Sequence, residues 1–142
     1  MCVTLHWHWK KIKSNIMPTK KRQQRSSIKI TEKNLNHFAL HYLSRYSATK
    51  EGLRKALQRR VEISAQNAGV DRKLATEWIE ALIRKYESLG YLNDRNYAES
   101  QMRTLISRGK STRAIVMKLR RKGVGLEDIE ASLEVARHEF SD

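Results

Sequence analysis

The sequence contains little cysteine or proline and has no long apolar run. Its single cysteine, Cys2, excludes an intramolecular disulfide framework, so a reducing compartment such as the cytoplasm is expected. No apolar stretch approaches the roughly 18 residues that a membrane helix needs, so we expect no membrane partner. Lys10, Lys11 and Lys13 follow Trp9 directly, which leaves no apolar core of signal-peptide length. Secreted and membrane-spanning classes are therefore not expected.

Acidic residues are also scarce. The chain has 142 residues, of which 15 are acidic and 29 are basic, and its formal net charge is +14. This balance favours nucleic acid or an acidic protein surface as the partner. Residues 1–30 contain eight basic residues, no acidic residue and the only proline, Pro18. We predict that residues 1–30 form a disordered basic tail, and Met17 is a second candidate for the start of translation.

One segment of the chain occurs twice. Residues 50–57 align with residues 112–119 at a shift of 62, which places Leu53 on Ile115. Further along, the triplet Ile-Glu-Ala at residues 79–81 recurs at residues 129–131, at a shift of 50. The change from 62 to 50 means that the first copy holds 12 extra residues. A repeated helical unit indicates an extended binding surface rather than a single-site enzyme.

Apolar residues follow a helical period from about residue 35 onward. Thr49 and Ser111 are natural N-caps, and Gly90 and Gly123 are placed to end helices. The longest apolar stripe comprises Leu74, Trp78, Ala81, Leu82, Lys85, Tyr86 and Leu89, and the last comprises Leu126, Ile129, Leu133, Ala136 and Phe140. No segment alternates with period two over the length of a strand. The sequence predicts an elongated all-α fold of tandem three-helix repeats, at residues 31–94 with an insertion near 61–74 and at residues 95–142.

Six motifs follow one another along the chain: ALHYLSRYS at residues 39–47, LRKAL at 53–57, GYLND at 90–94, YAES at 97–100, RGKS at 108–111 and KLRRKGV at 118–124. In order and spacing, these motifs resemble those of the RecX family. The resemblance covers about residues 35–137. RecX proteins usually carry three repeats, so the third repeat is expected to be missing from this chain. Gly125 stands where the family favours an aspartate cap, so the final helix is expected to begin less firmly.

The resemblance implies a regulator of the bacterial recombinase RecA that acts in DNA recombination, DNA repair and the SOS response. Such proteins bind the RecA–DNA filament, inhibit its activity and contact DNA. The candidate residues for binding DNA or RecA are Arg54, Lys55, Arg59, Arg60, Arg103, Arg108, Lys110, Arg113, Lys118, Arg120, Arg121 and Lys122. Residues 103–122 contain eight basic residues and no acidic one, which favours a functional patch over an ordinary solvated helix face. We expect binding to single- or double-stranded DNA without sequence preference.

Two other functions compete with this interpretation. A helix-turn-helix DNA-binding protein fits the helix lengths predicted after Ser111. However, Glu127, Asp128, Glu130 and Glu134 on its recognition helix would repel phosphate. A structural adaptor without nucleic-acid contact requires the basic excess to be incidental.

Metal and catalytic sites have little support. His37 and His41 are four residues apart but have no third ligand nearby in the sequence, and Cys2, His6 and His8 lie in the tail. No nucleophile motif or glycine-rich phosphate loop occurs. We therefore expect no enzyme activity, no cofactor and no metal.

Overall fold

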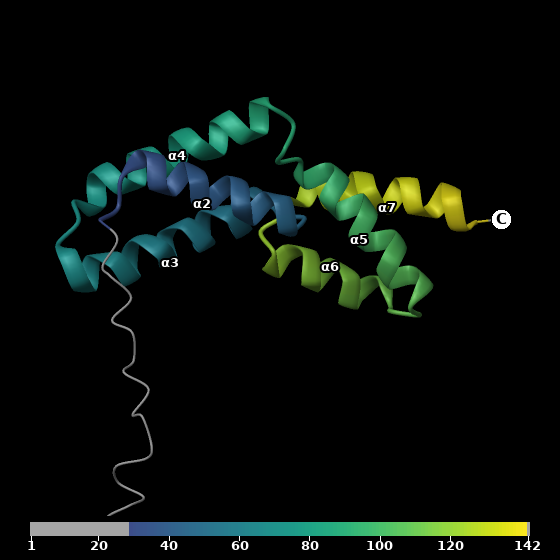
Figure 1. Ribbon diagram of the computed structural model, residues 1–142. Coiled ribbons are helices and arrows are strands. Elements are labelled where there is room, and N and C mark those ends of the chain that lie inside the picture. The colour runs from purple at the N-terminus through teal and green to yellow at the C-terminus, as the bar shows by residue number, and fades with distance from the viewer. Residues whose placement is uncertain (1–28, 142) are drawn as a thin grey trace, which may run out of the picture.

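The computed structural model describes residues 29–141, apart from the side chains at 67 and 68. This part of the chain forms six α-helices and contains no strand (Figure 1). The helices are α2 (Glu32–Arg45), α3 (Lys50–Ala68), α4 (Arg72–Ser88), α5 (Asp94–Ser107), α6 (Thr112–Arg121) and α7 (Leu126–Phe140). The predicted all-α class is confirmed. The tail predicted for residues 1–30 lies almost wholly outside the described residues.

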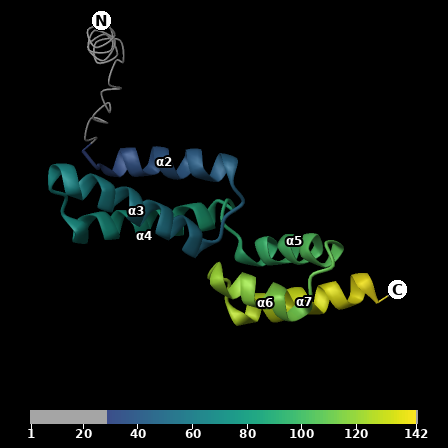
Figure 2. The same ribbon diagram turned by 90° about the horizontal axis from the view of Figure 1, so that it is seen from below.

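The helices form two groups of three that enclose separate cores. Leu53, Leu57 and Tyr86 belong to a hydrophobic cluster built from α2, α3 and α4, whereas Ile115 and Leu119 belong to a second cluster built from α5, α6 and α7. Figures 1 and 2 show the two groups one after the other along the molecule. The tandem, elongated arrangement is therefore confirmed, and the repeat bounds at residues 94 and 95 stay a prediction.

The two groups share one plan and differ in the length of their middle helix. Helices α2 and α5 each have 14 residues, and α5 begins 62 positions after α2. Helices α3 and α6 also begin 62 positions apart, but α3 has 19 residues and α6 has 10. The insertion near residues 61–74 thus mainly lengthens α3. Ile79 and Ile129, which define the shift of 50, are both buried.

Side chains cap the helices where the sequence predicts. Thr49 Oγ1 accepts a hydrogen bond from the backbone N–H three residues on at 3.0 Å, and Ser111 Oγ does so at 3.3 Å. Each bond satisfies a backbone donor that lacks a partner within its helix. Gly125 precedes α7 without a side-chain cap, as expected. Local sequence therefore sets where these helices begin.

The predicted apolar stripe of α4 is partly wrong. Leu74, Ala81 and Leu89 are exposed, and the buried face consists of Ala75, Ile79, Leu82, Ile83 and Tyr86. The buried face of α4 is the one in contact with α2 and α3, so packing selects it among several apolar rows. Leu126 and Phe140, at the two ends of α7, are likewise exposed. Trp78 is partly buried against the first core, as its position in the stripe predicted.

Candidate nucleic-acid interface

Helix α6 separates an apolar face from a cationic one. Ile115 and Leu119, one turn apart, are each only 1% exposed and pack into the second core. At 100° per residue, Arg113, Arg120 and Arg121 fall outside the arc that these two residues occupy, and all three are exposed. The capped start at Ser111 and the apolar pair thus turn the basic side chains outward. Positive charge in the last turn also suits the negative end of the helix dipole.

Three of the cations surround one hollow on this surface. Lys110, Lys118 and Arg121 line a depression of about 210 Å³, whose floor includes Leu105 and Ile115. Lys110 precedes α6 in the sequence, whereas Lys118 and Arg121 lie one turn apart within it. Three positive charges around a shallow hollow form a surface suited to phosphate.

Most of the predicted basic residues have no counterion in the described part of the chain. Within residues 29–141, no ion pair involves Arg59, Arg108, Lys110, Arg113, Lys118, Arg120, Arg121 or Lys122. Arg103 differs, because its guanidinium donates two hydrogen bonds of 2.8 Å to Glu139. These bonds lower the pKa of Glu139 and raise the pKa of Arg103. Among the predicted basic residues of the second group, Arg103 is therefore the least available to a partner.

The basic residues of the first group are more constrained. Arg54 donates hydrogen bonds to Glu80 at 2.7 Å and to Glu51 at 2.6 Å, which raise the pKa of Arg54. Lys55 lies 3.8 Å from Glu51. Arg60 lies over the ring of Phe38, 5.6 Å from its centroid, in a cation–π contact. Only Arg59 among the four predicted residues of α3 has neither an ion pair nor a ring contact within the described part of the chain.

The basic residues of α3 and those of the second group occupy only partly equivalent positions of the repeat. At a shift of 62, Arg59 and Arg60 correspond to Arg121 and Lys122, but Arg54 corresponds to Val116. The structure therefore gathers the free cations at α6 more strongly than at α3. Contact of any of these residues with DNA or RecA stays a prediction.

A polar junction joins the two groups. Thr49 Oγ1 donates a hydrogen bond of 2.6 Å to the backbone carbonyl of Lys122, so the start of α3 meets the end of α6. The backbone N–H of Lys50 donates to Asp94 Oδ1 at 2.9 Å. Burial raises the pKa of Asp94 above its ordinary value, although this hydrogen bond and the charge of Lys50 act in the opposite direction. These residues carry contacts that sequence reasoning missed, because it assigned Thr49 only as a cap and Asp94 only to a motif.

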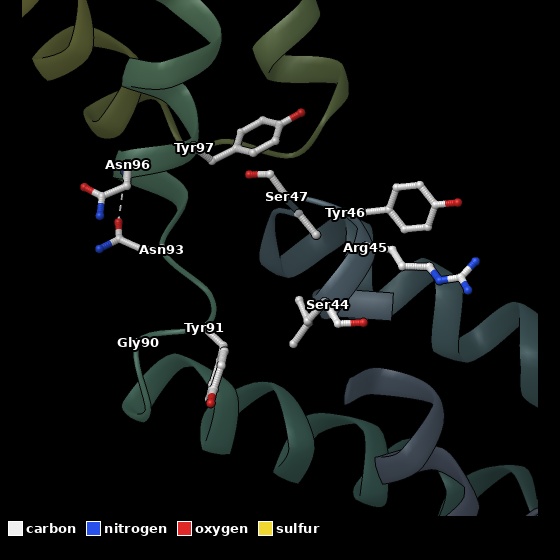
Figure 3. A pocket seen from close by; sticks show the side chains of 11 residues that line it. Ser44, Arg45, Tyr46, Ser47, Gly90, Tyr91, Asn93, Asn96 and Tyr97 are labelled. Atoms are coloured by element: carbon white, nitrogen blue, oxygen red, sulfur yellow. Dashed lines mark hydrogen bonds between the residues drawn. The ribbon is translucent and has the colours of Figure 1, made fainter. Parts of the chain in front are cut away.

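A pocket of about 420 Å³ lies beside this junction. Its walls come from the end of α2 and its following loop, residues 43–48, and from the connection between α4 and α5 together with the first turn of α5 (Figure 3). Figure 3 shows Tyr91, Asn93 and Asn96 on one side and Ser47 across from them, while Arg45 and Tyr46 extend away from the opening. The pocket was not predicted, because it exists only where the two repeats meet.

The structure offers little to the competing sites. His37 and His41 are exposed and line a hollow with Arg60, and residues 29–141 contain no group of three His, Cys, Asp or Glu placed to hold a metal ion. Cys2, His6 and His8 lie outside the described residues. None of the described helices is long and apolar enough to cross a membrane.

The acidic residues of α7 bear on the helix-turn-helix alternative. Glu127, Glu130 and Glu134 are exposed, and Asp128 is partly buried. A recognition helix enters the major groove between two rows of phosphates. The exposed carboxylates of α7 would be repelled by these phosphates, because both groups are negatively charged. The observed exposure therefore does not favour α7 as a recognition helix.

Comparison with known proteins decides the family. The family model described as RecX, second three-helix domain, matches residues 93–133, which span α5, α6 and most of α7. The regulatory protein RecX of Myxococcus xanthus (strain DK1622) is 41% identical over 127 residues, which cover 88% of this chain and 68% of that protein. The chain belongs to the RecX family. No solved structure matches it. The resemblance inferred from the sequence motifs is thus confirmed, and the RecX family supports a regulatory role.

Proposed function

We propose that this RecX-family chain binds the RecA–DNA filament, inhibits the recombinase and contacts DNA without sequence preference. The regulatory role of the family supports a regulator, and the RecA filament is the target that the family resemblance implies. Such a role places the protein in the cytoplasm, in DNA recombination, repair and the SOS response, and requires no catalytic step.

The free cations of α6 are the observation that carries the DNA contact. Arg113, Lys118, Arg120 and Arg121 project from one short helix, and no acidic residue occurs in residues 103–122. Because these side chains have no counterion within the described chain, a phosphate can bind them without displacing an existing ion pair. The elongated body carries this surface beside the first group of helices, which suits contact with a filament more than with a single small ligand.

The direct test adds the purified protein to RecA filaments on single-stranded DNA and follows ATP hydrolysis and strand exchange. The expected result is a dose-dependent loss of both activities. An unchanged rate at protein concentrations equal to or above that of RecA would show that the proposed function is wrong.

A pair of variants assigns the activity to α6. Arg120→Ala with Arg121→Ala should weaken inhibition, because two free cations are removed from the proposed surface. Arg72→Ala with Arg137→Ala is the matched control, since it removes the same charge from exposed residues that pair with Glu62 and Glu134 instead. Equal inhibition by both double variants would reject the α6 surface while leaving RecA inhibition itself intact.

A further inference from the structure

One large apolar side chain of α6 faces solvent. Met117 is 55% exposed, although it stands in the sequence between the buried residues Ile115 and Leu119. It is two positions from each of them, and at 100° per residue it points about 160° away from both. Met117 therefore lies at the centre of the face that α6 turns away from the second core.

Arginine side chains surround Met117 on this face. Arg113 precedes it by four positions, and Arg120 and Arg121 follow it by three and four. Residues at these spacings are neighbours on the surface of a helix, so one arginine lies a turn before Met117 and two lie a turn after it. All three arginines are exposed, and none forms an ion pair within the described part of the chain. These four residues, the outer face of α6, form an apolar centre with a cationic rim.

The composition of the outer face of α6 is that of a protein interface. Single exposed apolar side chains are common on protein surfaces, so the exposure of Met117 alone indicates little. Protein–protein interfaces, however, are enriched in Met and Arg and depleted in Lys, Glu and Asp. Within about 60° of Met117 around the helix lie only the three arginines and Ala114. Methionine is also unbranched and flexible, so it fits pockets of irregular shape.

Phosphate contact alone does not account for Met117. A row of phosphates pairs with arginines but gives no apolar surface on which the thioether can be buried. Lys110 and Lys118, which line the hollow described above, lie to one side of the outer face, since Lys118 is about 100° around the helix from Met117. An acidic protein surface suits the outer face better, because its carboxylates can bind arginine with two parallel hydrogen bonds and can surround an apolar pocket.

We infer that the outer face of α6 docks on an acidic protein surface, where Met117 enters an apolar pocket and the three arginines pair with carboxylates around it. The inference rests on the proposed function and assigns to this face the contact with the RecA subunits of the filament. Lys110 and Lys118, beside the hollow, remain available to phosphate. A few well-packed central residues carry most of the binding energy of an interface, so the loss of Met117 should weaken the protein contact and spare the DNA contact.

The test replaces Met117 by Gln, which has a similar length but is polar, and leaves every cation in place. Leu40→Gln is the matched control, because Leu40 is an apolar residue of α2 that is 44% exposed. Inhibition of ATP hydrolysis by RecA filaments measures the protein contact. Fluorescence anisotropy with labelled single-stranded and duplex DNA, in the absence of RecA, measures the DNA contact.

The two readouts should separate for Met117→Gln. Half-maximal inhibition should require roughly 10- to 30-fold more of this variant than of the parent, while its affinity for both forms of DNA should equal that of the parent. Leu40→Gln should match the parent in inhibition and in DNA affinity.

Met117→Ala takes the place of Met117→Gln if circular dichroism shows that the latter fails to fold, because alanine is the best helix former. A folded Met117 variant that inhibits as well as the parent overturns the inference and leaves the proposed function standing. A variant that loses affinity for DNA alone as strongly as it loses inhibition also overturns it, since Met117 would then insert between bases. An equal loss of inhibition by Leu40→Gln has the same consequence. A parent protein that does not inhibit RecA overturns both proposals.

Discussion

The junction between the repeats makes a quantitative prediction at Gly123. This residue follows α6 with a φ of 81°, a conformation that residues with a side chain rarely adopt. A Cβ atom placed on Gly123 would lie 2.4 Å from Cβ and 2.7 Å from Cγ of Glu51, at the start of α3. The Cβ of Glu51 cannot rotate away, because the backbone of α3 fixes it. Gly123→Ala therefore forces the two repeats apart in addition to straining the local backbone.

Gly109 provides a control that isolates the contact. It has a similar φ of 74°, but a Cβ there meets no atom within 4 Å. Gly109→Ala should therefore show the backbone strain alone, on the order of 1–2 kcal/mol. Gly123→Ala should lose a further ~1–3 kcal/mol, which is typical of an atom forced into a packed contact. Separation of the helices would also lengthen the 2.6 Å hydrogen bond from Thr49 to the Lys122 carbonyl.

Urea denaturation followed by far-ultraviolet circular dichroism measures both free energies of unfolding. The expected order of stability is parent, then Gly109→Ala, then Gly123→Ala. If the two variants agree within about 0.5 kcal/mol, the typical effect of a surface change, the repeats do not meet closely at Gly123 and the reasoning is refuted.

Four further outcomes are expected. Leu119→Ala should lower the free energy of unfolding by about 2–5 kcal/mol, because the Leu119 side chain is only 1% exposed. Arg120→Ala with Arg121→Ala should change the free energy of unfolding by no more than about 0.5 kcal/mol. Thermal melts of the two proteins check both values, and equal losses of stability would contradict the assignment of core and surface. Hydrogen bonds from Arg54 lower the pKa of Glu80 below its ordinary 4.5. This carboxylate therefore stabilises the fold above that pH and ceases to do so as the pH falls through its folded pKa. Glu80→Gln should flatten the acid limb of the stability curve by about 1 kcal/mol or less, since the pair is partly exposed to solvent, and an unchanged acid limb would contradict the pairing. DNA affinity should fall with salt at a log–log slope of about −0.9 for each duplex phosphate neutralised, and a flat response would rule out phosphate contacts.

The helices and the repeat could be predicted because they depend on residues close together in the sequence. Thr49 and Ser111 each accept a hydrogen bond from a backbone donor three residues away. Leu53 in α3 and Ile115 in α6 occupy equivalent positions of the repeat, and both are buried. Such local patterns have nearly the same consequence whatever surrounds them. The outward face of α6 followed for the same reason, since an apolar pair on a short helix leaves its cations on the other side.

Availability of the basic residues could not be predicted in this way. Arg54 is held by Glu80, 26 positions away, and Arg103 by Glu139, 36 positions away. Neither pairing follows from helical periodicity, because each requires two helices to lie in contact at one register. The buried row of α4 was misjudged for the same reason, since α2 and α3 select it.

The sequence by itself thus determined the family, the helical class, the repeat and a basic α6, because all four depend on patterns of residues that lie close together in the sequence. Only the tertiary structure decided how the repeats join. The contact of Thr49 with Lys122 spans 73 positions and that of Lys50 with Asp94 spans 44. These contacts, and the pocket at Tyr91 beside them, depend on the relative placement of two separately folded groups of helices, for which no local sequence pattern exists.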